Sequence, residues 1–251
     1  MDLAGGLSMD LAGGLLMELR MPHPHVVVER TAAGYLRLLI SRPDRRNALD
    51  AGMVRALINA FRAEPSALVV LGSTDPSVFC AGADLALSDA QRSETSDLLY
   101  ECYEVMITRP GPVIAVIGGP AVGGGAQLAT AADLRIAGPA ARLRWAGPPG
   151  RDLSVGAWLL PDLVGRGAAL ELTLTGRWVD AADALRLGLL HRVDDDPEQA
   201  AASLAETLLT RGAGALANVK TVTAAGDLLG RLHAERDTNR AAWTRPAAGP
   251  G

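Results

Sequence analysis

The chain has 251 residues, of which 49% are hydrophobic and only 4% aromatic, so a sizeable core must be built mainly from Ala, Val and Leu. The net charge of −4 argues against a nucleic-acid partner, and no apolar run reaches the roughly 18 residues that span a membrane. The two cysteines, Cys80 and Cys102, have no metal-ligand spacing, which predicts a reduced, cytoplasmic protein without a metal site.

The N-terminal segment contains a direct repeat, because Met1–Leu7 recurs as Met9–Leu15. It lacks the basic start of a signal peptide. We therefore expect residues 1–20 to be an extension that packs poorly against the rest of the chain.

Strands and helices alternate after this extension. Two strands are predicted at 26–30 and 34–40, and Asp50 is a suitable N-cap for a helix over 53–63. The further expected elements are strands at 67–71, 112–117, 134–136, 143–145 and 190–193, and helices at 88–108, 126–132, 154–164, 168–174 and 181–187. Alternation of this kind favours an α/β core over residues 21–195, followed by a helical region over 196–251.

A glycine-rich turn lies at the centre of the chain. The apolar run Pro112–Ile117 predicts a buried strand, and Gly123, Gly124 and Gly125 then open a predicted helix. Unpaired N–H groups at a helix start lie at the positive end of its dipole, so the turn can bind an oxyanion or a phosphate. Close packing explains such a turn equally well. The P-loop and dinucleotide signatures are absent.

A match to known sequences extends over residues about 26 to 235, and it rests on motifs in this turn and on both sides of it. They are Ser41–Leu49, Phe79–Leu85, Pro112–Gly125, Ala132–Ile136, Leu160–Gly165, Leu172–Gly176 and Ala181–Leu189. In this order they resemble the enoyl-CoA hydratase/isomerase (crotonase) family. The resemblance implies a crotonase-like spiral of ββα turns with a C-terminal helical region, assembled as a homotrimer or a dimer of trimers.

The resemblance also implies an acyl-CoA ligand, with the CoA thioester as substrate or ligand and no separate cofactor. The thioester oxygen would accept two backbone N–H bonds, which map to Ala83 and Gly124. Fixed backbone dipoles of this kind stabilise the negative charge that develops on that oxygen when an enolate forms.

Further residues would surround the thioester if the resemblance holds. Arg45 and Arg46 lie on a loop that resembles the family's CoA-contacting segment, although a solvated charge pair is an equally good interpretation. The residues expected near the ligand beside the oxyanion donors are Ala81, Asp84, Leu85 and Gly123.

The chain departs from the family where hydratases carry two catalytic glutamates. The first position is Gln127, and an ungapped alignment places Gly147 at the second. An amide exchanges no proton near neutral pH, and glycine offers no side chain at all. Asp152 is the nearest replacement, because it falls beside the position where dienoyl-CoA isomerases of the family carry an aspartate. Alternatively Asp152, or Ser154, caps the following helix.

Two functions from different classes follow from these residues. The first is a lyase or isomerase that forms a thioester enolate with a non-standard acid–base set. The second is a catalytically silent acyl-CoA carrier or sensor that keeps only the oxyanion donors. The remaining polar side chains are expected to be non-catalytic: Glu101, Glu104, Asp133, His191 and His233.

Overall fold

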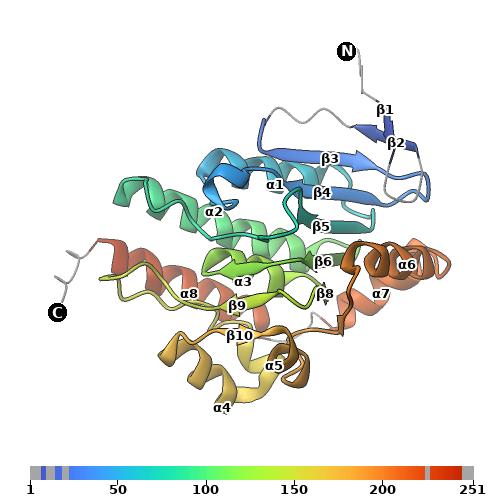
Figure 1. Ribbon diagram of the computed structural model, residues 1–251. Helices are drawn as coiled ribbons and strands as arrows, with labels where there is room; N and C mark the ends of the chain where they lie inside the picture. Colours follow the sequence, from blue (N-terminus) through green and yellow to red (C-terminus); the bar gives the residue numbers. More distant parts are fainter. Residues whose placement is uncertain (1–6, 10–14, 19–22, 224–226, 245–251) are drawn as a thin grey trace.

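The computed structural model describes residues 7–9, 15–18, 23–223 and 227–244. In this part of the chain one sheet contains, in spatial order, β1 (Leu7–Met9), β2 (Leu15–Glu18), β3 (Val26–Arg30), β4 (Leu36–Ile40), β5 (Val69–Ser73), β6 (Val113–Ile117), β8 (Leu134–Ala137) and β11 (Arg192–Val193) (Figure 1). A second sheet contains β10 (Val179–Asp180), β9 (Arg142–Arg144) and β7 (Pro120–Val122). The strands from β1 to β4 are antiparallel neighbours, and those from β4 to β11 are parallel.

The helices alternate with these strands, as the sequence predicts. They are η1 (Pro43–Arg45), α1 (Ala51–Ala63), α2 (Asp89–Thr108), α3 (Gly124–Ala131), α4 (Leu160–Thr175), α5 (Ala181–Arg186), α6 (Pro197–Leu209), α7 (Ala213–Thr223) and α8 (Leu228–Trp243). Asp50 caps α1 as expected, since its carboxylate accepts a 2.9 Å bond from Met53 N. The predicted α/β core is therefore confirmed, and α6, α7 and α8 form the expected helical region at its C-terminal end.

Strand β6 is buried on both faces of the sheet. Val113, Ala115 and Ile117 belong to the core that contains α1 and α2, whereas Ile114 and Val116 pack with alanines of α6. This alternation of sides is the two-residue period of a strand. The sequence of a parallel strand that is covered on both faces is a continuous apolar run. Such a run at 112–117 is what predicts β6.

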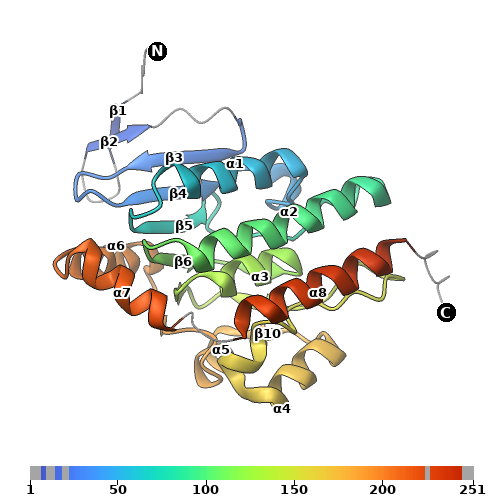
Figure 2. The same ribbon diagram turned by 180° about the vertical axis from the view of Figure 1, so that it is seen from behind.

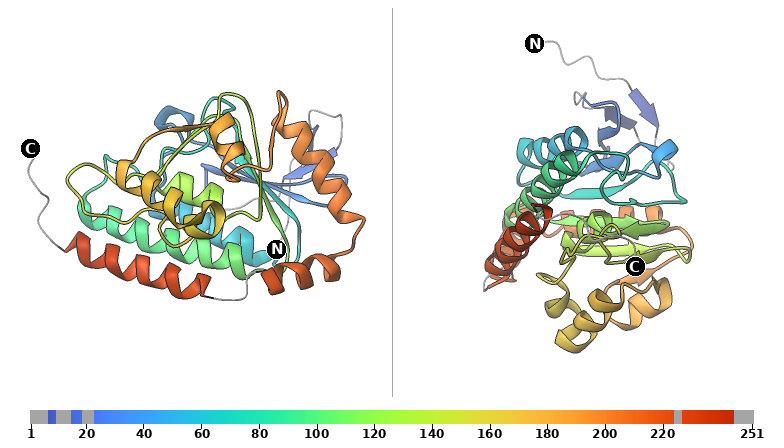
Figure 3. Two further views of the ribbon diagram at one scale, coloured as in Figure 1. Left: turned by 90° about the horizontal axis from the view of Figure 1, so that it is seen from below. Right: turned by 90° about the vertical axis from the view of Figure 1, so that its left-hand side faces the viewer.

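The helices α1, α2 and α8 follow one another across one face of the molecule (Figure 2). In Figure 3 the long helices α2 and α8 run alongside each other, although more than a hundred residues separate them in the sequence. The C-terminal region is thus not a separate body, because it covers the helix that precedes the central strand.

One predicted boundary is wrong. Residues 154–159 are not helical, and α4 begins at Leu160 and continues to Thr175 with a non-helical Gly165, so the two predicted helices are one interrupted helix. Neither Asp152 nor Ser154 caps it. The physical reason is that side chains of α8 bind the backbone here: Ser154 N donates to Asn239 and Gly156 N donates to Glu235.

The N-terminal prediction concerns residues that lie partly outside the described ones. Within the described ranges, β1 pairs with β2, and β2 pairs with the start of the core sheet at β3. Poor packing of residues 1–20 stays a prediction.

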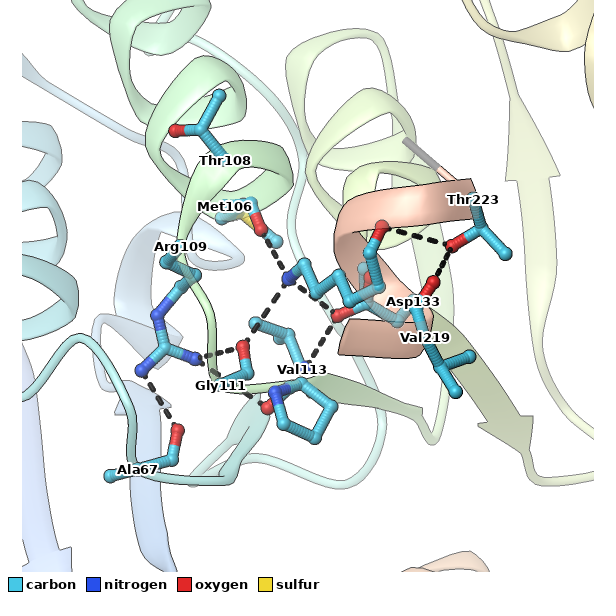
Figure 4. Close-up of polar contacts among 12 residues, drawn as sticks. Ala67, Met106, Thr108, Arg109, Gly111, Val113, Asp133, Val219 and Thr223 are labelled. Atoms are coloured by element: carbon cyan, nitrogen blue, oxygen red, sulfur yellow. Dashed lines mark hydrogen bonds and ion pairs between the residues drawn. The ribbon is translucent and has the colours of Figure 1, made fainter. Parts of the chain in front are cut away.

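The helix α7 is held to the core by an ion pair with the partly buried Asp133, whose polar contacts are drawn in Figure 4. Lys220 Nζ donates to Met106 O at 2.7 Å and lies 2.8 Å from Asp133 Oδ2. The same carboxylate oxygen accepts Val113 N at 2.7 Å. Asp133 therefore joins α7 to the start of β6, which agrees with the structural role expected for it.

Candidate functional site

Two turns lie side by side and present the predicted oxyanion donors. Val122 N donates to Cys80 O at 2.9 Å, and Cys80 N donates to Pro120 O at 3.2 Å, so the segments that lead to Ala83 and Gly124 are hydrogen-bonded neighbours. The N–H groups of Ala83 and Gly124 have no acceptor among the described residues. Both are available to a ligand oxygen, as oxyanion donors must be.

Glycine is required at two positions of these turns. Gly82 has a φ of +86°, and a Cβ there would lie 2.7 Å from Val122 O. Gly123 has a φ of +54° and precedes the first residue of α3. L-residues rarely adopt such angles, so these glycines fix the direction in which the next N–H group points.

A cavity of about 160 Å³ opens in front of these donors. Its walls come from the two turns, from one face of α2, from the end of α8 and from residues 146–155. Most of this surface is apolar, which suits an acyl chain. The lining includes Ala81, Ala83, Leu85, Gly123, Gly124, Gln127 and Gly147, all singled out from the sequence, together with Arg92, Ser96, Leu99, Tyr100, Asn239 and Trp243.

Gln127 lies in the wall of this cavity but its carbonyl group is fully engaged. Its Oε1 accepts Trp158 Nε1 at 2.7 Å and Gly156 N at 3.1 Å. Because the side chain is 5% exposed and its carbonyl faces the loop before α4, Gln127 positions that loop. It has no proton to exchange with a substrate.

Behind Gln127 lies a carboxylate that the sequence did not reveal. Glu235 of α8 accepts Tyr100 OH at 2.9 Å, Gly156 N at 2.9 Å and Trp158 N at 2.8 Å. Asn239, one turn further along α8, donates to the Tyr100 oxygen at 2.8 Å. Tyr100 lines the cavity, so it separates Glu235 from the ligand space.

Burial raises the pKa of Glu235 to about 7, and the bonds from Tyr100, Gly156, Trp158 and Ser154 oppose that shift. Desolvation dominates because the groups that bind Glu235 are neutral dipoles and none is a cation. The pKa of Tyr100 is raised by burial and by this carboxylate. The phenol is therefore a neutral hydrogen-bonding group.

The predicted CoA-contacting residues are only partly brought together. Arg45 and Arg46 are exposed on the loop before α1 and do not line the cavity. The loop is nevertheless tied to the oxyanion turn, since Arg46 O accepts Ala81 N at 3.1 Å. Asp84 is 6% exposed and pairs with Arg42 at 3.0 Å, so its carboxylate is engaged within the protein.

Asp152 and Gly147 occupy different parts of the loop over the cavity. Gly147 lines the cavity, and a Cβ there would lie 3.2 Å from Leu153 Cβ. The residue that the sequence aligns with the second glutamate therefore lines the cavity without contributing a side chain. Asp152 is exposed and is not among the lining residues.

Three of the residues that are expected to be non-catalytic, Glu101, Glu104 and His191, lie outside the cavity. Glu101 pairs with Arg62 at 2.9 Å and Glu104 pairs with His233 at 3.1 Å, both on the outer side of α2. His191 Nδ1 accepts Arg135 N at 3.1 Å. All three contacts are made within the protein.

Known proteins resemble this chain in sequence. The sequence matches the model of the family described as enoyl-CoA hydratase/isomerase over residues 30–245. A relative from Mycobacterium leprae, named as the probable enoyl-CoA hydratase echA6, is 37% identical over 172 residues, covering 64% of this chain and 68% of its own.

Solved structures of similar proteins have the same fold. An enoyl-CoA hydratase from Mycobacterium avium subsp. paratuberculosis superposes with a TM-score of 0.79 at 26% identity, covering 90% of this chain and 92% of its own. A monofunctional enoyl-CoA isomerase from M. smegmatis gives a TM-score of 0.69 at 28% identity, covering 79% of this chain and 91% of its own.

Proposed function

The chain belongs to the enoyl-CoA hydratase/isomerase family, and on this basis we propose that it binds acyl-CoA thioesters and polarises the thioester carbonyl with the N–H groups of Ala83 and Gly124. The observation that carries the proposal is that both N–H groups lack a protein acceptor in the described structure and face one apolar cavity. Two such donors favour an enolate over the neutral thioester.

The protein is proposed to be a poor hydratase. Hydration requires a group that activates water and a group that delivers a proton, and each contributes roughly 10²–10⁴-fold in rate. Gln127 and Gly147 supply neither. Isomerisation of a double bond needs only one group that moves a proton, so an isomerase is the enzyme that fits this site better.

Asp152 is our candidate for that proton transfer. Its side chain is exposed, so residues 147–153 would have to move for it to reach the thioester. The alternative function is a silent acyl-CoA carrier or sensor. The fully hydrogen-bonded carbonyl of Gln127 favours it, because the cavity wall then positions a ligand without acting on it.

Other parts of the proposal concern assembly and location. We propose a homotrimer or a dimer of trimers, in line with the family resemblance. Both cysteines are free and buried, which fits a reducing compartment such as the cytoplasm.

Calorimetry tests the ligand. Hexanoyl-CoA should bind at least about tenfold more tightly than free CoA or than S-hexyl-CoA, a thioether of the same length without the carbonyl oxygen. Equal affinities for hexanoyl-CoA and S-hexyl-CoA would refute the oxyanion donors. Acetyl-CoA in the same series separates the contribution of the carbonyl from that of the acyl chain.

Turnover separates the two functions. The isomerase proposal expects conversion of a 3-enoyl-CoA that falls in Asp152→Asn and is unchanged in Asp195→Asn, an exposed control in a distant turn. A wild-type protein that binds acyl-CoA but turns over neither a 2-enoyl-CoA nor a 3-enoyl-CoA would be the carrier.

A further inference from the structure

The end of the cavity away from the oxyanion donors is polar. Leu99 marks the oxyanion end, because a Cβ added to Gly124 would lie 2.7 Å from Leu99 Cδ1. Arg92 and Ser96 lie on the same side of α2, nearer its N-terminus, and both line the cavity. Seven residues separate Arg92 from Leu99, which is about 10 Å along a helix. An acyl chain that runs from the oxyanion donors along α2 would bring its far end to these polar groups.

Two N–H donors at this end have no acceptor. Arg92 Nε and Trp243 Nε1 are both buried and make no hydrogen bond within the described residues. The Ser96 hydroxyl, one helical turn from Arg92, also makes none there. Native proteins seldom leave buried donors unpaired, so both donors could pair with an oxygen that a ligand brings to this end of the cavity.

The charges around these donors favour an anionic oxygen. Asp89 pairs with the guanidinium groups of both Arg92 and Arg151, so one carboxylate is shared between two cations. Both guanidinium groups also lie over the Trp243 ring, with centroid distances of 5.6 Å for Arg92 and 5.3 Å for Arg151. This packing holds Arg92 in place, and hydrogen bonds from a fixed cation to a carboxylate are stronger than those to a neutral acceptor.

We propose that the acyl group ends in a carboxylate, which accepts hydrogen bonds from Arg92, Trp243 and Ser96. The ligand class is then an ω-carboxyacyl-CoA, whose thioester lies at Ala83 and Gly124 and whose free carboxylate lies at the start of α2. This inference rests on the proposed binding of acyl-CoA and adds the identity of the far end of the acyl chain.

Matched acyl chains test it in the full chain. Adipyl-CoA should bind roughly ten- to a hundredfold more tightly than hexanoyl-CoA, and suberyl-CoA should likewise exceed octanoyl-CoA if the longer chain fits. Equal affinities within each pair would overturn the inference, since water would then be the acceptor.

Variants locate the effect. Arg92→Gln should abolish the preference for adipyl-CoA while hexanoyl-CoA affinity changes little, and Trp243→Phe should reduce it by a few fold because the ring remains and only the N–H is lost. Arg55→Gln removes an exposed positive charge on α1 and should leave the preference intact. A preference that survives Arg92→Gln, or that falls equally in Arg55→Gln, would also overturn the assignment.

The two proposals fail in different ways. In one outcome hexanoyl-CoA binds more tightly than S-hexyl-CoA, but adipyl-CoA binds only as tightly as hexanoyl-CoA. The oxyanion donors are then supported and only the carboxylate end is refuted. If hexanoyl-CoA and adipyl-CoA both bind no better than CoA itself, the proposed function is refuted and this inference with it.

Discussion

Two buried polar clusters attach the C-terminal helices to the core, and they balance charge differently. The α7 cluster pairs the Lys220 ammonium with Asp133 at 2.8 Å. The pocket cluster, formed by Gln127, Tyr100, Glu235 and Asn239, contains a carboxylate that only neutral groups bind. Each cluster spans more than 80 residues of sequence, but only the first holds a compensated charge.

This difference sets how each cluster responds to pH. Burial lowers the pKa of Lys220, but the Asp133 carboxylate opposes the shift and favours the charged form. Burial raises the pKa of Glu235 to about 7, and four neutral donors do not reverse it. A counter-charge therefore opposes the loss of the Lys220 proton, whereas the pocket cluster has no cation to oppose the rise in the pKa of Glu235.

The largest loss of stability expected from a substitution comes from breaking the α7 cluster. Lys220→Met leaves the partly exposed Asp133 carboxylate with its bond from Val113 N and the more distant Arg109 and Arg135, so the loss should fall below the roughly 3–5 kcal/mol of a fully buried pair, at about 2–3 kcal/mol. Urea unfolding followed by circular dichroism measures the change in the free energy of unfolding.

A surface pair is the control for that measurement. Arg240 lies 3.1 Å from Asp97 with about half of its side chain exposed, so Arg240→Gln should change stability by about 0–1 kcal/mol. If Lys220→Met costs no more than Arg240→Gln, the pair in Figure 4 does not hold α7 to the core.

The pocket cluster should make the free energy of unfolding depend on pH. Glu235 has a folded pKa of about 7 against an ordinary value of 4.5, so the folded state binds more protons between these values. The free energy of unfolding should therefore fall by about 3 kcal/mol as the pH rises from below 4.5 through 7. The Glu235→Gln variant has no carboxyl group to ionise at this position, so it should lose this slope.

The comparison of slopes separates titration from packing. At low pH the neutral wild-type acid and the amide of Glu235→Gln each offer one carbonyl oxygen to the N–H groups of Gly156 and Trp158, so the two proteins should be close in stability there. The stability of the variant relative to wild type should then improve between pH 4.5 and 7. Parallel curves for the two proteins would show that Glu235 keeps an ordinary pKa.

The sequence predicts the parts of the site that depend on local backbone. Gly82, Gly123 and Gly124 stand in collinear motifs, and the free N–H groups follow from the turns that these glycines allow. The strand β6 and the cap at Asp50 are predicted for the same reason, because apolar runs and capping residues act within a few positions.

The pocket cluster could not be predicted in this way. Tyr100 and Glu235 meet across 135 residues, and nothing in the composition of either helix indicates which face packs against the other. The non-helical segment 154–159 was missed for the same reason, since Asn239 and Glu235 bind its N–H groups. A long-range side-chain contact overrides the local preference of that segment for helix.

The smallest expected effect is that of Gln127→Glu, which restores a carboxylate at the first glutamate position while Gly147 remains at the second. The new carboxylate would replace an amide oxygen that shares the Gly156 N–H with Glu235, at 3.1 and 2.9 Å respectively. Two carboxylates that share one donor repel each other, so the pKa of at least one rises further. Gly147 still supplies no second acid.

The rate of crotonyl-CoA hydration, measured by the loss of the enoyl absorbance, should therefore increase by less than about tenfold in Gln127→Glu. Adding Glu235→Gln removes the repulsion and should leave the new carboxylate ionised, which makes the double variant the matched comparison. A gain of about a hundredfold or more from Gln127→Glu alone would mean that one carboxylate suffices for hydration in this cavity.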